Sequence, residues 1–195
     1  MKLGFIGTGK IASSVIIGIC NSKIKFKQII VSPRNKKTAN FLKKNFRKVN
    51  IAKNNQDVIN KSSWIFLSVT PKVGEKVIKN LRFNTNQTIV SFISTINLSD
   101  LKKMIKVKSK IVRAIPLPPI SLKKGPVPIY PPNKKVKNFF DNLGSTIEIK
   151  NEKLSINFWS TSGMMAAYYD ILRVMSDWLV KKGIKKQDAQ KYITS

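Results

Sequence analysis

Residues 1–20 read MKLGFIGTGKIASSVIIGIC, and this stretch decides the fold. A short apolar run over Lys2–Ile6 leads into the turn Gly7-Thr8-Gly9, and Ala12 completes the pattern G-x-G-x-x-A. After the turn, apolar residues recur at the spacing of a helix, at Ile11, Val15, Ile16 and Ile19. A strand that enters a helix through such a turn is typical of proteins that hold a dinucleotide.

Each position of this turn has a physical role in the prediction. Gly7 allows the tight turn, Gly9 lets a pyrophosphate approach the backbone, and Ala12 lets the helix pack close to the strand. The N-terminus of the helix supplies free N–H groups and a positive dipole for phosphates. The predicted cofactor-binding residues here are Gly7, Thr8, Gly9, Lys10 and Ile11. The alternative is an ordinary buried strand and turn.

Composition bounds the class of protein. The 195 residues, 42% of them hydrophobic, suffice for one domain and part of a second. No apolar run approaches the roughly 18 residues of a membrane span, and the N-terminus lacks a signal-peptide layout, so we expect a cytoplasmic protein without membrane contact. Cys20 is the single cysteine and histidine is absent. We therefore expect no metal site, no histidine-based triad and no internal disulfide, and interpret Cys20 as a small buried hydrophobe.

The formal net charge of +28 raises the alternative of a nucleic-acid-binding protein. The positive charge is nearly all lysine and is spread along the whole chain, without the interleaved aromatic residues of a stacking platform. We therefore expect no nucleic-acid partner. The charge can still help to attract an anionic cofactor.

Apolar runs alternate with helical patterns along the first three quarters of the chain. The pattern predicts further strands at 28–32, 49–52, 64–69, 87–93, 110–114, 127–130 and 146–149. It predicts helices at 36–44, 55–60, 73–81 and 134–143, and another that starts at Asp100 with Ser99 as its cap. This alternation indicates an α/β fold, a Rossmann-type, mostly parallel sheet, over residues 1–151.

The pattern becomes purely helical over residues 152–195. A long helix from Leu154 onward has a broad apolar face, Gly183 is its expected C-terminal cap, and a second helix begins near Lys186. About 45 residues are few for an independent domain. We expect this helical segment to pack on a second subunit, or to be an incomplete domain.

The end of the second strand bears on the choice of cofactor. NAD sites usually place an acidic residue there, but the run here is Ser32-Pro33-Arg34-Asn35-Lys36. Ser32 and Asn35 can donate hydrogen bonds, and Arg34 can pair with a 2′-phosphate. These residues favour NADP over NAD. The alternative is that Arg34 and Lys36 are simply solvated charges.

Three more strand ends are expected at the same edge of the sheet, where open α/β sheets bind ligands. The fourth strand ends in Val69-Thr70-Pro71, the end of the fifth gives Ser94 and Thr95, and the end of the sixth gives the rigid run from Arg113 through Pro116 to Pro119. Among these, the predicted cofactor-binding residues are Val69, Thr70, Pro71, Ser94 and Pro116. Alternatively, these loops merely connect strands. Arg113 is either a buried charge that fixes its turn or a surface charge.

Four blocks in this order resemble the pyrroline-5-carboxylate reductase family. The family patterns are G-x-G-x-M-A, V-K-P, R-x-M-P-N-T-P and S-G-S-G-P-A-Y. Here the blocks are Gly7-Thr8-Gly9-Lys10-Ile11-Ala12, Val69-Thr70-Pro71, Arg113 to Pro119, and Ser162-Gly163-Met164-Met165-Ala166-Ala167-Tyr168. The resemblance implies reduction of a cyclic imine to proline with a nicotinamide cofactor, usually NADPH, and a helical dimerisation segment that makes a homodimer or a higher homo-oligomer. The cofactor would supply the hydride, and the protein positioning and electrostatics.

The chain departs from the family on the substrate side. Leu117 stands where the family has asparagine, and Met164 and Met165 replace the second serine and glycine of S-G-S-G-P. The resemblance gives the substrate-side candidates Leu117, Ser162, Gly163 and Met164, with no certain catalytic residue. These departures leave two alternatives open. The chain could be a homologue that binds NADP without catalysis and acts through dimerisation or sensing, or a reductase of a different small substrate.

Overall fold

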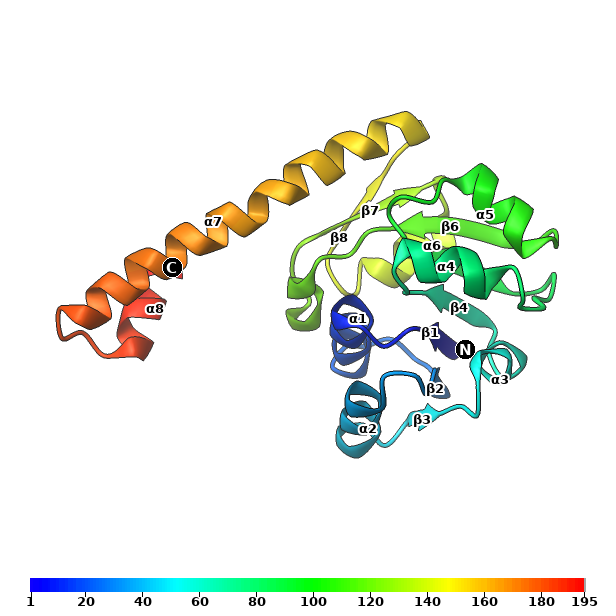
Figure 1. Cartoon of the computed structure of the whole chain (residues 1–195), viewed down its shortest axis with the longest axis horizontal. Coiled ribbons are helices and arrows are strands. Elements are labelled where there is room, and N and C mark those ends of the chain that lie inside the picture. The colour runs from blue at the N-terminus through cyan, green and yellow to red at the C-terminus, as the bar shows by residue number, and fades with distance from the viewer. Residues whose placement is uncertain (195) are drawn as a thin grey trace. The chain divides into compact units, whose positions relative to one another are not determined.

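The structure is a computed structural model that describes residues 1–194. It divides into two compact units, Met1–Glu152 and the segment from Lys153 onward. The first unit alternates strands and helices (Figure 1). Its elements are β1 (Lys2–Ile6), α1 (Lys10–Cys20), β2 (Gln28–Val31), α2 (Lys36–Asn45), β3 (Val49–Ile51), α3 (Asn55–Asn60), β4 (Trp64–Leu67), α4 (Pro71–Ile78), β5 (Thr88–Ser91), α5 (Leu98–Ile105), β6 (Lys110–Ala114), η1 (Pro118–Leu122), β7 (Pro126–Tyr130), α6 (Lys134–Phe140) and β8 (Ser145–Glu148).

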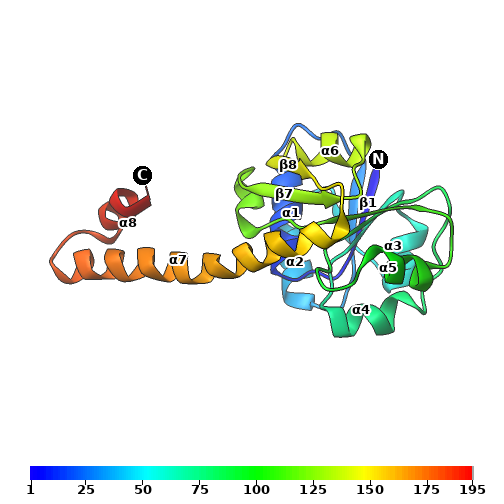
Figure 2. The same cartoon turned by 90° about the horizontal axis from the view of Figure 1, so that it is seen from above.

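Within residues 1–194 the strands form one eight-stranded sheet in the order β3-β2-β1-β4-β5-β6-β7-β8. Each neighbouring pair is parallel except β6 and β7, which run antiparallel. The strands β7 and β8 lie with α6 at one edge of the sheet (Figure 2). The order of the strands reverses between β1 and β4, and α/β sheets bind ligands at such a switch point. The predicted α/β fold with a mostly parallel sheet is confirmed.

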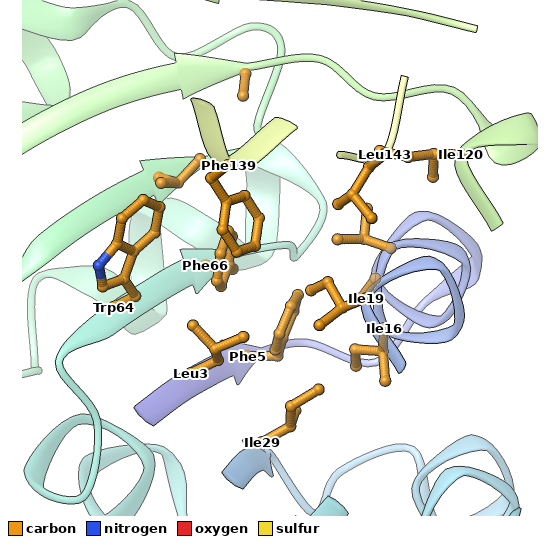
Figure 3. Packing of buried hydrophobic residues seen from close by; sticks show 14 of the residues in the cluster. Leu3, Phe5, Ile16, Ile19, Ile29, Trp64, Phe66, Ile120, Phe139 and Leu143 are labelled. Carbon is orange, nitrogen blue, oxygen red and sulfur yellow. The ribbon is translucent and has the colours of Figure 1, made fainter. Parts of the chain in front are cut away.

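Apolar side chains cover both faces of the sheet because successive residues of a strand point to opposite sides. Leu3 and Phe5 of β1 pack with the helices α1, α2 and α6, whereas Ile6 packs with α3, α4 and α5. Phe5 stacks on Phe66 with ring centroids 4.4 Å apart (Figure 3). The buried sheet therefore holds the ends of its strands in fixed positions.

Helix α1, which carries the glycine turn, is pressed against η1. A Cβ atom on Gly18 would lie 2.4 Å from the carbonyl oxygen of Ile120, so only glycine fits this approach. Cys20, at the end of α1, is half-buried against the core, and burial raises the pKa of its thiol to about 11. The thiol therefore stays protonated at neutral pH, as expected of a small hydrophobe.

Most boundaries differ from the predictions by one to three residues, and two of these differences lie beside the switch point. The strand predicted to end at Val69 ends at Leu67, and α4 begins at Pro71 rather than at residue 73. Proline suits the first position of a helix because its missing N–H would have no partner there. The predicted cap Ser99 is also wrong. Helix α5 is capped by Asn97, whose side chain accepts a hydrogen bond from the Asp100 N–H.

The second unit consists of the short turn η2 (Glu152–Leu154), which begins on the last residue of the first unit, and the helices α7 (Ser155–Lys181) and α8 (Lys186–Thr194). Gly183 follows α7 with a φ of +93° and donates its N–H to the carbonyl oxygen of Val180, in the left-handed conformation that ends many helices. Among the described residues, no helix is long and apolar enough to cross a membrane.

Candidate functional site

The turn between β1 and α1 contains two glycines under different constraints. Gly7 has a φ of +99°, and a Cβ atom there would lie 2.5 Å from the carbonyl oxygen of Ser68. A Cβ atom on Gly9 would meet no atom within 4 Å. Gly9 also gives α1 no side-chain cap, so no capping side chain occupies the first N–H groups of the helix. This turn leaves room for an anion directly on the backbone.

The end of β2 holds the glycine turn in place. The Gly7 N–H donates to Oγ of Ser32 at 2.9 Å, and Nδ2 of Asn35 donates to the carbonyl oxygen of Thr8 at 3.3 Å. Asn35 also caps α2, since its Oδ1 accepts from the Thr38 N–H. Ser32 is only 2% exposed. Its hydroxyl therefore contacts the turn, and direct binding of a cofactor by Ser32 stays a prediction.

A pocket of about 400 Å³ lies at this edge of the sheet. It brings together six of the predicted residues, namely Gly7, Thr8, Ser32, Arg34, Asn35 and Val69. Asn55 of α3 and Val73 and Val77 of α4 complete its lining and were not predicted. Two signals could have found them: Asn55 closely follows the carboxyl end of β3, which meets the same edge, and the two valines stand one helical turn apart.

The pocket fits the anionic cofactor that the sequence predicts. Among the described residues that line it, none is acidic and the exposed Arg34 is the one cation. The buried Oγ1 of Thr8 has no hydrogen-bond partner among the described residues, which is uncommon for a buried hydroxyl. A free hydroxyl, free N–H groups and a cation at one edge suit a phosphate-bearing nucleotide.

The other predicted cofactor residues lie outside this pocket. Lys10 and Ile11 form the first turn of α1, while Thr70 and Pro71 begin α4. Thr70 is exposed and makes no side-chain cap to α4, so both helices start with uncapped N–H groups beside the switch point. Ser94 is half-buried after β5 and Pro116 is buried after β6. Their binding roles stay predictions.

The sequence left open whether Arg113 is a buried charge or a surface charge, and the structure shows that it is buried. It is 5% exposed on β6. Its guanidinium donates to the carbonyl oxygen of Ser94 and forms an ion pair with Glu152. The arginine therefore joins the ends of two neighbouring strands.

The substrate-side candidates belong to both units. Leu117 is half-buried in the first unit, at the residue that precedes η1. Ser162, Gly163 and Met164 lie on α7 in the second unit, where Oγ of Ser162 donates to the carbonyl oxygen of Phe158 at 2.7 Å and Met164 is 72% exposed. Their roles toward a substrate stay predictions.

The glycine turn, the uncapped helices and the switch point define a dinucleotide-binding domain of the oxidoreductase class. A family model described as NADP oxidoreductase coenzyme F420-dependent matches residues 2–97. The chain is 26% identical to the pyrroline-5-carboxylate reductase of Synechocystis over 201 residues, which are 98% of this chain and 74% of the relative. This chain therefore resembles pyrroline-5-carboxylate reductases over nearly its whole length.

Solved structures show the same fold. The 1-pyrroline-5-carboxylate reductase of Streptococcus pyogenes superposes with a TM-score of 0.79 at 25% identity and covers 100% of this chain and 75% of its own. The Plasmodium falciparum pyrroline carboxylate reductase, solved with NADP bound, gives a TM-score of 0.82 at 24% identity, over 99% of this chain and 74% of its own. The fold of this chain is therefore shared with these enzymes over nearly its whole length.

Proposed function

We propose that this chain reduces the carbon–nitrogen double bond of a cyclic imine with NADPH, converting 1-pyrroline-5-carboxylate to proline. The observation that carries the proposal is the match to a pyrroline-5-carboxylate reductase over 98% of the chain, with an open glycine turn where the cofactor binds. When bound, NADPH supplies a hydride to the imine carbon, and a proton completes the N–H bond.

The residues of this chain bind and orient the cofactor in the proposed reaction. The N–H groups at the start of α1 donate to the pyrophosphate, which Gly9 allows to approach the backbone. Ser32 and Asn35 hold the turn in the shape that exposes these N–H groups. Their contribution is positioning, which lowers the entropic part of the barrier.

We infer that the cofactor is NADP rather than NAD because of Arg34. It is the one cation among the residues that line the pocket, and it can pair with a 2′-phosphate. Replacement by serine, Arg34→Ser, is expected to weaken NADPH binding about tenfold to a hundredfold, since a hydrogen bond to a charged group contributes roughly 1.5–3 kcal/mol. NADH binding is expected to stay the same.

The matched control for Arg34 is Lys36→Ser. Lys36 is exposed two residues further on and does not line the pocket. The substitution Lys36→Ser removes one positive charge, as Arg34→Ser does, and is expected to leave NADPH binding unchanged. Titration of both cofactors against tryptophan fluorescence gives the affinities. An equal loss in the two variants would mean that only the overall charge matters, and would contradict the role given to Arg34.

The activity itself is tested by following NADPH oxidation with 1-pyrroline-5-carboxylate. Turnover with formation of proline is expected. The apolar Leu117 after β6 and the exposed Met164 favour the two alternatives, a homologue that binds NADPH without catalysis and a reductase of a different small substrate. Tight binding of NADPH without turnover of the pyrroline substrate would contradict the proposed activity, and turnover of another small substrate would then separate the two alternatives.

We further propose that α7 joins two copies of the chain into a homodimer. Among the described residues of this helix, eight large apolar side chains are exposed: Met164, Tyr168, Tyr169, Ile171, Val174, Met175, Trp178 and Val180. A helix that exposes so much apolar surface needs a partner. A second copy offers the same surface and satisfies this need symmetrically.

A further inference from the structure

The ion pair of Arg113 and Glu152 links three segments of the first unit. Arg113, on β6, donates through Nη2 to the carbonyl oxygen of Ser94 and through Nη1 to Oε1 of Glu152. The side chains of Arg113 and Glu152 are 6% and 25% exposed. Burial of two charges is costly, so such a pair persists only where good geometry and further hydrogen bonds compensate.

Glu152 makes a second contact, with the start of helix α5. The same Oε1 accepts a hydrogen bond from the Leu98 N–H at 2.7 Å. Leu98 is the first residue of α5, and a carboxylate at the start of a helix also interacts favourably with the helix dipole. Thus Arg113 holds the carbonyl of Ser94, where the loop 94–97 begins, and Glu152 holds the N–H that follows its end.

We call Arg113 and Glu152, which hold the two ends of the loop 94–97, the clamp. The position of this loop in the sheet suggests the role of the clamp. The loop follows β5, whereas the glycine turn and Arg34 belong to β1 and β2, on the other side of the switch between β1 and β4. A dinucleotide bound at a switch point lies with one half on each side. The adenosine half therefore belongs to the side of Gly7 and Arg34, and the nicotinamide half to the side of the loop 94–97.

We propose that Arg113 and Glu152 are positioning residues that fix the loop 94–97 for the nicotinamide half of the cofactor. This inference rests on the proposed function for the identity of the cofactor. The two residues act through the loop, since Nη1 and Nη2 of Arg113 and Oε1 of Glu152 contact Ser94, Leu98 and each other. A clamp of this kind changes the binding of one half of the dinucleotide and leaves the other half unaffected.

Two conservative variants loosen the clamp without removing the side chains. Glu152→Gln removes the charge but keeps an oxygen that can accept from the Leu98 N–H. Arg113→Lys keeps the charge but replaces a planar fork by a single ammonium, which cannot reach both Ser94 and Glu152 in the same way. The matched control is Val136→Ala, which destabilises the core at α6, in a cluster of buried residues that contains no residue of the loop.

The test compares the dissociation constants of 2′,5′-ADP, which represents the adenosine half, and of NADPH, at a temperature where every variant is folded. Both clamp variants are expected to weaken NADPH roughly tenfold and to change 2′,5′-ADP by less than about twofold. Val136→Ala is expected to lower the melting temperature and leave both constants unchanged. Faster hydrogen exchange at the Leu98 amide of the cofactor-free Glu152→Gln variant is a second expected result.

Other outcomes overturn the inference. Equal weakening of both ligands would mean that the ion pair acts on the whole domain. Unchanged affinity for both ligands, with only a lower melting temperature, would mean that the pair merely stabilises the fold. A wild-type protein that binds neither ligand would refute the proposed function and this inference with it, and is distinguished from the other results because it appears before any substitution.

Discussion

Gly7 and Gly9 stand two residues apart in one turn, but different forces require them. Gly7 needs a left-handed backbone and would clash with the carbonyl oxygen of Ser68 if it carried a side chain. Gly9 has an ordinary φ of −73° and empty space around it. Glycine is therefore required at position 7 by the fold itself, and at position 9 only by the approach of a ligand.

This difference predicts opposite effects for the same substitution at the two positions. Gly7→Ala is expected to lower the free energy of unfolding by at least about 1–3 kcal/mol because of its strained backbone. Gly9→Ala is expected to cost less than about 1 kcal/mol in stability, the loss of a favourable helix-cap residue, but to weaken NADPH binding strongly. Denaturant unfolding and cofactor titration of each variant give the two numbers. A Gly9→Ala protein that binds NADPH like the wild type would show that no phosphate approaches this backbone.

The sequence predicts the role of a residue best where that role depends on the conformation of the backbone. The positive φ of Gly7 and the buried Ala12 follow from the spacing of one motif. The hydroxyl of Ser32 accepts from the Gly7 N–H, a contact that the sequence did not predict, while its direct binding of a cofactor stays a prediction. The direction of a hydroxyl depends on neighbours that are distant in sequence, and Ser32 and Gly7 are 25 residues apart. The same reason left Glu152 unrecognised as the partner of Arg113.

Elements of secondary structure were predicted best where the local pattern was strong. The helix Asn55–Asn60 and the strand Lys110–Ala114 have the predicted bounds. The cap of α5 was misplaced because Asn97 and Ser99 are both good capping residues, and only the turn of the backbone selects Asn97. Caps matter here because one of them, Asn35, connects α2 to the glycine turn.

The double role of Asn35 predicts a separation of stability from binding. Asn35→Ala and Asn133→Ala each remove a side-chain cap, of α2 and α6, and each is expected to cost about 1 kcal/mol of stability. Asn35 also donates to the carbonyl oxygen of Thr8, so only its replacement is expected to weaken NADPH binding, by about twofold to tenfold. Thermal unfolding and cofactor titration of the pair test this. Equal NADPH affinity in the two variants would refute the link between α2 and the turn.

At the scale of the whole molecule, the positive net charge and the apolar side chains of α7 favour different partners. The formal net charge of +28 favours the approach of an anionic cofactor at long range, and this attraction weakens with added salt. The apolar side chains of α7 favour a contact that is insensitive to salt. The composition indicated both properties, but the sequence could not say which residues of α7 are exposed, because exposure depends on the packing around the helix.

The apolar surface of α7 predicts how the assembly responds to substitution. The wild-type protein is expected to sediment as a dimer at micromolar concentration and to remain so in high salt. The double variant Ile171→Glu and Trp178→Glu replaces two side chains that are each 58% exposed, and is expected to sediment as a monomer because burial of unpaired carboxylates is costly. Lys181→Glu, on the last turn of the same helix, changes the charge in the same direction and is expected to leave the dimer intact. Since the glycine turn lies in the first unit, the monomeric variant should still bind 2′,5′-ADP. A wild-type protein that stays monomeric across this concentration range would contradict the proposed dimer.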